Sequence, residues 1–204
     1  MDHGRLPWLR PEQIDAEQRE LYDRVTSSFR ATSATIPLLD PEGRLHGPFN
    51  PMLTSPATGL ALEALGRALR SSDTLPRLVF EAVVIMCASS LRASYEWYAH
   101  APLAKQAGLS DEQVDAVFRG DFERLVPTVS AGLVRLVIAS LHHARPADED
   151  VAAVRSQFGA GAVTEVVVTI GHYHVIGMLM STWDSPMPEG VPDPFADAAQ
   201  RKGP

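Results

Sequence analysis

The feature that most restricts the fold of this chain is the apolar segment 81–109, EAVVIMCASSLRASYEWYAHAPLAKQAGL, which carries two carboxylates and one imidazole. Glu81 lies among large apolar residues, where a charged side chain is costly unless it is paired. Glu96 and His100 are four residues apart, so on a helix they share a face and can touch. A buried carboxylate beside an imidazole is a pair suited to proton transfer.

Glu81 and Glu96 can serve one site only if the chain reverses its direction between them. One unbroken helix would hold them roughly 22 Å apart along its axis. The intervening residues 89–94, SSLRAS, offer three serines that can cap a new helix. We therefore predict a helical hairpin that bends between Ser89 and Ser94. Its second helix begins near Glu96 and His100, where the helix dipole favours an anion.

This segment resembles the carboxymuconolactone decarboxylase family, which includes the AhpD-type alkylhydroperoxidases. The family pattern has a Glu, two Cys twelve and fifteen residues later, and a His four residues beyond the second Cys. Glu81 and His100 stand at the Glu and His positions, whereas Ala93 and Glu96 stand at the two Cys positions. The run YEWYAHAPLAKQAGL is similar to the decarboxylase-type branch, in which E-W-x-x-H-x-x-x-A replaces C-x-x-C. A looser resemblance covers residues 47–188.

The resemblance implies an all-α fold, a helical bundle of the AhpD type with a central helical hairpin. It implies homo-oligomers, commonly trimers or hexamers, and it implies neither a metal nor a cofactor. The implied activity is that of a lyase or isomerase of the carboxy-lyase type. Its substrates would be small carboxylated lactones or related enolisable acids, in aromatic catabolism or in the tailoring of secondary metabolites.

Loss of CO2 from such an acid leaves an enolate that must receive a proton on carbon. We expect His100 to deliver this proton and Glu96 to orient His100 or to shuttle the proton itself. Glu81 is expected to be a buried acid that keeps His100 and Glu96 ready to transfer the proton. The residues expected to bind the substrate are Arg92, Trp97, Phe49, His172 and Tyr173, with Arg77 as a further candidate to anchor a carboxylate.

Each candidate also has a structural interpretation. Glu96 and His100 can be a surface pair worth a few tenths of a kcal/mol, and Glu81 can be a structural acid that bonds backbone or Arg. His172 and His174 point about 200° apart on a helix, so they form no metal pair, and either can be a core histidine. Cys87 lies off both family Cys positions and is typical of an inert core thiol.

Three other functions remain open. Glu81, Glu96 and His100 could together bind Mn or Fe, although the resemblance implies no metal. A non-catalytic, oligomeric small-molecule-binding protein could keep the same pocket. A peroxidase is disfavoured, because that reaction needs a thiolate and a resolving thiol and the chain has one cysteine.

The composition narrows the class of protein. A chain of 204 residues is expected to form one domain over residues 1–204 with a substantial core. The net charge of −7 without a basic cluster argues against nucleic acid and membrane partners and leaves a small molecule. Residues 162–180 come nearest to a membrane span but contain Glu165 and two histidines. The first residues lack an apolar signal core, so we expect a cytoplasmic protein.

Apolar periodicity predicts helices and no β-sheet. Within residues 1–56 we expect a helix over 11–30, followed by a proline-rich, non-helical loop over 32–56 that is ordered as a cover. The tail 184–204 is expected to be extended. The helix 162–183 is apolar nearly all round and needs cover on every side, which also favours an oligomer. The remaining helices are predicted over 57–70, 76–89, 93–107, 110–118, 128–143 and 147–158.

Overall fold

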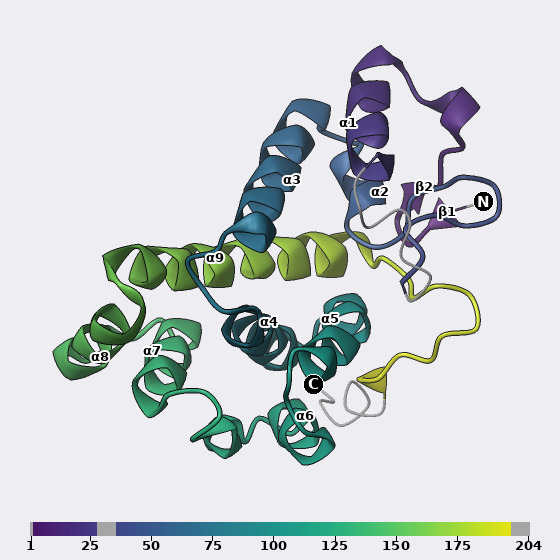
Figure 1. The fold of residues 1–204 in the computed structure, drawn as a ribbon. Helices are drawn as coiled ribbons and strands as arrows, with labels where there is room; N and C mark the ends of the chain where they lie inside the picture. The colour runs from purple at the N-terminus through teal and green to yellow at the C-terminus, as the bar shows by residue number, and fades with distance from the viewer. Residues whose placement is uncertain (1, 28–35, 197–204) are drawn as a thin grey trace. The chain divides into compact units, whose positions relative to one another are not determined.

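In a computed structural model, which describes residues 2–27 and 36–196, most of the described chain is helical and the one sheet is short (Figure 1). The predicted all-α class is therefore confirmed. The expectation of no β-sheet is wrong at one place, where Asp2–His3 (β1) pairs antiparallel with Leu6–Pro7 (β2). Two-residue strands are too short to show an alternating pattern in the sequence.

The chain falls into two compact units. The first comprises residues 1–67 and 176–193, and the second comprises residues 68–175 and 194–204. Helices α3 (Pro56–Ser71) and α9 (Ala160–Trp183) each contribute residues to both units. The single domain expected over residues 1–204 stays a prediction.

The first helix of the first unit begins later than its sequence suggests. Pro11 opens only a 3₁₀ turn, η1 (Pro11–Gln13), and α1 covers Ala16–Thr26. Asp15 caps α1, because its carboxylate accepts from the Gln18 N–H while the Gln18 side chain accepts from the Asp15 N–H. This capping box fixes the start of the helix more strongly than a proline does. Residues 28–30 of the predicted helix lie outside the described residues.

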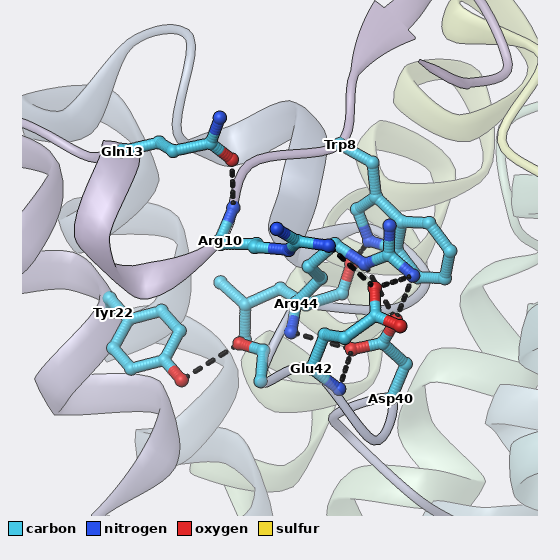
Figure 2. A network of polar contacts seen from close by, with 9 residues as sticks. Trp8, Arg10, Gln13, Tyr22, Asp40, Glu42 and Arg44 are labelled. Carbon is cyan, nitrogen blue, oxygen red and sulfur yellow. Dashed lines mark hydrogen bonds and ion pairs between the residues drawn. The ribbon is translucent and has the colours of Figure 1, made fainter. Parts of the chain in front are cut away.

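The structure describes the proline-rich segment from residue 36 onward, while residues 32–35 lie outside the described part; that this segment forms an ordered cover stays a prediction. The Asp40 carboxylate accepts from the backbone N–H groups of Glu42 and Arg44 (Figure 2). The Arg44 guanidinium lies 2.5 Å from Asp40 and 2.6 Å from Glu42, and stacks 3.9 Å above the Trp8 ring. One expectation fails here, because Phe49–Met52 form a helical turn, α2. Proline is tolerated in a first turn, since no N–H is needed there.

Within the first unit, N-terminal residues form hydrogen bonds with the last carbonyls of α9. The Arg5 N–H donates to the Trp183 carbonyl at 2.8 Å, and the Arg5 guanidinium donates to the Thr182 carbonyl at 2.9 Å. The last carbonyls of a helix have no partner inside the helix, so these two bonds satisfy them. Gly4 is needed beside Arg5, because a Cβ there would lie 2.1 Å from the Asp184 carbonyl oxygen.

His3 is buried beside this contact. Its side chain is packed 4.9 Å from the Trp8 ring and 6.4 Å from the His46 ring, and neither ring nitrogen has a hydrogen-bond partner among the described residues. Burial, followed by the influence of His46 and Arg44, lowers the pKa of His3 to about 4, and burial also lowers the pKa of His46. The folded protein therefore holds His3 neutral at a pH where the unfolded chain has protonated it.

We predict that His3 makes the protein less stable as the pH falls. The stability due to the neutral ring is complete above the ordinary pKa of 6.5 and is lost as the pH falls toward about 4. Between pH 7 and pH 5 the free energy of unfolding should fall by about 2 kcal/mol more in the wild type than in His3→Phe, which keeps the ring but not the titration. Urea unfolding of both proteins measures this, and equal pH dependence would contradict it.

The second unit is built around one buried helix. α4 (Arg77–Leu91) is buried at every residue from Val79 to Ser89, and α5 (Ser94–Gln106) lies beside it (Figure 1). The helix predicted over 110–118 is present, and Ser110 and Gln113 form a capping box at its start. The other elements of this unit, besides parts of α3 and α9, are α6 (Asp111–Phe118), η3 (Phe122–Leu125), α7 (Ala131–Leu141) and α8 (Asp148–Phe158).

Among the described residues, α9 keeps large apolar side chains that remain exposed. Val167, Val175 and Met178 are large apolar side chains left exposed. In the part of the chain that the structure describes, α9 is also the one helix long and apolar enough to cross a membrane. Core helices of soluble proteins have the same length and composition, so this property alone is weak evidence of a membrane span.

Candidate functional site

The predicted bend between the two central helices is present, and it is made by a helix-ending motif. α4 ends at Leu91, Arg92 adopts the left-handed conformation with φ 52°, and α5 begins at Ser94. The Ala93 N–H bonds the Ala88 carbonyl at 2.8 Å, and the Arg92 N–H bonds the Ser89 carbonyl at 3.1 Å, which is the Schellman pattern. Contrary to expectation, no serine caps α5, because Ala93 occupies that position.

The hairpin brings Glu81 of α4 against His100 of α5. Glu81 Oε2 lies 2.8 Å from His100 Nδ1, and both side chains are buried. An ionised carboxylate can only accept hydrogen bonds, so Nδ1 carries the proton in this contact. In a neutral His100, Nε2 is therefore the nitrogen that is free to accept a proton.

The other oxygen of Glu81 faces Arg77. Arg77 Nη2 lies 2.5 Å from Glu81 Oε1, one helical turn away, in an ion pair that does not have hydrogen-bond alignment. The Glu81 carboxylate is fully buried, whereas the Arg77 side chain is 48% exposed. The pair therefore connects a buried anion to a cation at the surface.

His100 Nε2 has two neighbours. The Tyr173 hydroxyl of α9 lies 3.2 Å from Nε2, and the two rings meet edge to face at 5.1 Å. Glu96 Oε2 of α5 lies 3.5 Å from the same nitrogen. The described contacts thus form a continuous chain of polar groups, Arg77–Glu81–His100, with Tyr173 and Glu96 at its far end.

The structure therefore brings Glu81, Glu96 and His100 together. The interpretation of Glu96 and His100 as a surface pair is wrong, since both side chains are buried. Tyr173, predicted to bind substrate, directly contacts His100. Such an arrangement can hold a proton on either side of the imidazole ring and move it along hydrogen bonds.

Two residues expected to bind substrate pack against the C-terminal segment. The Arg92 guanidinium lies 4.6 Å from the Phe195 ring centre and donates to the Phe195 carbonyl at 3.3 Å. Trp97 contacts the same ring at 6.0 Å and contacts Phe118 at 5.1 Å. Phe195, in the tail beyond residue 184, is buried in the second unit, and the role of Arg92 and Trp97 in substrate binding stays a prediction.

The remaining two substrate-binding candidates belong to different units. His172 is buried beside Tyr173 in the second unit, with ring centres 5.2 Å apart. Phe49 is buried in α2, in the first unit. In the described contacts, His174 forms no hydrogen bond with the cluster of polar groups at His100. Its Nδ1 lies 3.0 Å from the Ile170 carbonyl of its own helix.

Cys87 lies in the middle of α4 and is fully buried. Burial raises the pKa of its thiol to about 12, so it holds almost no thiolate at neutral pH.

No group of three or more His, Cys, Asp or Glu in residues 2–27 and 36–196 is arranged to hold a metal ion. The described contacts at His100 are hydrogen bonds and ion pairs between side chains.

We predict that Cys87 does not react with thiol reagents in the folded protein. With its pKa near 12, labelling by Ellman's reagent at pH 8 should be slower than that of an ordinary thiol by at least about a thousandfold. Unfolding in guanidinium should release one reactive thiol. The Cys87→Ala variant is the control and should give no signal in either state, and rapid labelling of the folded wild type would contradict the buried position.

The sequence could have revealed the contact of Arg77 with Glu81, but Arg77 was expected to anchor a substrate carboxylate. Arg77 and Glu81 are four residues apart on a predicted helix, which is the spacing of an intrahelical ion pair. The Tyr173 contact with His100 spans 73 residues of sequence and follows only from the packing of α9.

Comparison with known proteins does not assign this chain to a family, because no protein-family model and no curated protein matches it.

Proposed function

We propose that this protein is a cofactor-independent lyase or isomerase of the carboxymuconolactone decarboxylase type. The observation that carries the proposal is the 2.8 Å contact between Glu81 Oε2 and His100 Nδ1 in a buried setting. It gives His100 a defined tautomer with Nε2 as the reactive nitrogen. The expected substrate is a small carboxylated lactone or a related enolisable acid.

The chemistry assigned to this site is proton transfer to or from carbon. When the carboxylate leaves as CO2, the electrons of the broken C–C bond pass into the adjacent carbonyl as an enolate. The enolate then takes one proton on carbon, and the site recovers that proton from water. In an isomerisation the same group removes a proton from carbon and returns it at another position. Neither reaction needs an oxidant or a reductant.

Each residue of the cluster has a part in this proposal. Glu81 holds Nδ1 and stabilises the imidazolium that forms when Nε2 takes a proton. In this proposal Glu96, which is buried like His100 and lies 3.5 Å from Nε2, passes the proton between the ring and a substrate. Glu96 is then a shuttle, while Tyr173 donates its hydroxyl hydrogen bond to Nε2 in the neutral ring.

A peroxidase is the weaker alternative. The family reaction that it would follow needs a reactive thiolate, and Cys87 is buried with a pKa raised to about 12. The homo-oligomer remains part of the proposal. It is supported by the apolar side chains Val167, Val175 and Met178, which α9 leaves exposed in the single chain.

We predict that His100→Ala lowers turnover by about two to four orders of magnitude, which is the usual contribution of a general acid or base. KM should change less than kcat, because the proton transfer is made in the transition state. The assay is deuterium incorporation at carbon from D2O, followed by NMR on a panel of carboxylated lactones, which detects decarboxylation and isomerisation alike. His142→Ala, which removes an exposed histidine, is the matched control.

Glu96→Gln separates the two roles of Glu96. If Glu96 carries the proton to substrate, this variant should lose as much turnover as His100→Ala. If it only orients the imidazole, the loss should be at least about tenfold smaller than for His100→Ala. Wild-type turnover by His100→Ala, or no deuterium exchange by the wild type with any acid of the panel, would refute the proposed function.

A further inference from the structure

The position of Arg77 departs from what a helix prefers locally. Arg77 is the first residue of α4, and the first turn of α4 contains no acidic side chain. The N-terminal end of a helix carries a partial positive charge, so a cation there is disfavoured. Residues placed against local preference are often held there by another requirement, and the contact that Arg77 makes is the ion pair with Glu81.

The side chain of Arg77 also packs against an aromatic ring. Its guanidinium lies 5.4 Å from the Phe80 ring centre, and Phe80 meets the Tyr173 ring at 6.3 Å. Tyr173 in turn contacts His100. Arg77 therefore contacts Glu81 directly and packs on Phe80, a ring that in turn meets Tyr173.

Arg77 is the partner of Glu81 that carries a positive charge whatever the state of the site. Arg77 Nη2 lies 2.5 Å from Glu81 Oε1, whereas His100 on the other oxygen is a cation only when it is protonated. The Glu81 carboxylate is fully buried, where an uncompensated charge is costly. Without Arg77, a proton on His100 is the compensation that the described contacts offer to this carboxylate.

We propose that Arg77 is a positioning residue which keeps Glu81 ionised, so that Glu81 fixes the tautomer of His100; this role rests on the function proposed above. If Arg77 is removed, the buried Glu81 carboxylate is compensated by a proton on His100 instead. His100 then gives up that proton only at higher pH. The groups that face His100 and respond to this change are Glu81 from α4, Glu96 from α5, and Tyr173 with the neighbouring His172 from α9.

Arg77→Gln and Arg77→Lys test this role, and Arg135→Gln is the matched control. Arg135 also forms a 2.6 Å ion pair, with the buried Asp150, and its own side chain is half-exposed like that of Arg77. The control thus removes an equivalent ion pair from the same unit without touching His100. If Arg77→Gln does not fold, Arg77→Met carries the same test, because it keeps an apolar stem over Phe80.

The first readout needs no substrate. Ring ¹⁵N and ¹³C signals of histidine-labelled protein are followed against pH, and those of His100 are assigned by their loss in His100→Ala. The midpoint of the His100 titration should move to higher pH in Arg77→Gln and Arg77→Met. It should stay near the wild-type position in Arg77→Lys and in Arg135→Gln. An unmoved midpoint in a folded Arg77→Gln or Arg77→Met variant would overturn the role of Arg77.

The second readout is the pH dependence of turnover. The rate profile of Arg77→Gln should shift to higher pH, with a loss of about tenfold on its acidic side, and Arg77→Lys should restore most of it. The two proposals fail separately. A moved midpoint without turnover in the wild type supports Arg77 and refutes the lyase, whereas turnover with an unmoved midpoint refutes only the role of Arg77.

Discussion

A carboxylate cannot remain ionised inside an apolar helix without partners, and the surroundings of Glu81 follow from this constraint. Glu81 is fully buried in α4, the helix at the centre of the second unit. One partner, Arg77, comes from the same helix and reaches the surface, while the other, His100, must come from a second helix. The reversal of the chain at Arg92 supplies that second helix. The hairpin of α4 and α5 therefore both covers apolar surface of α4 and gives the Glu81 carboxylate its second partner.

The hairpin was predictable because it follows from distance alone. Two carboxylates on one straight helix lie too far apart to share a site, so the chain between them had to turn. The capping box of Ser110 and Gln113 was predictable for a different reason, since its residues lie within one helical turn. Local signals of this kind need no knowledge of the tertiary structure.

Other features depend on packing between distant segments, which sequence periodicity does not encode. Tyr173 reaches His100 because α9 packs near the hairpin, and Phe195 returns to Trp97 from beyond the last helix. Arg92 shows how such contacts alter local expectations. A left-handed residue at a helix end is usually glycine, because other residues lose about 1 kcal/mol there, and the contacts of Arg92 with Phe195 offset that cost.

The bonds from Arg5 to the last carbonyls of α9 have a consequence for the order in which the chain can acquire its structure. The bond from its guanidinium joins positions 177 residues apart, so the first unit is built from segments that are distant in the sequence. During synthesis the segment around Arg5 is made long before α9. The segments of α4 to α8 are also made before α9 and can pack early through short-range contacts. The segment around Arg5 must therefore wait for α9 before these bonds can form.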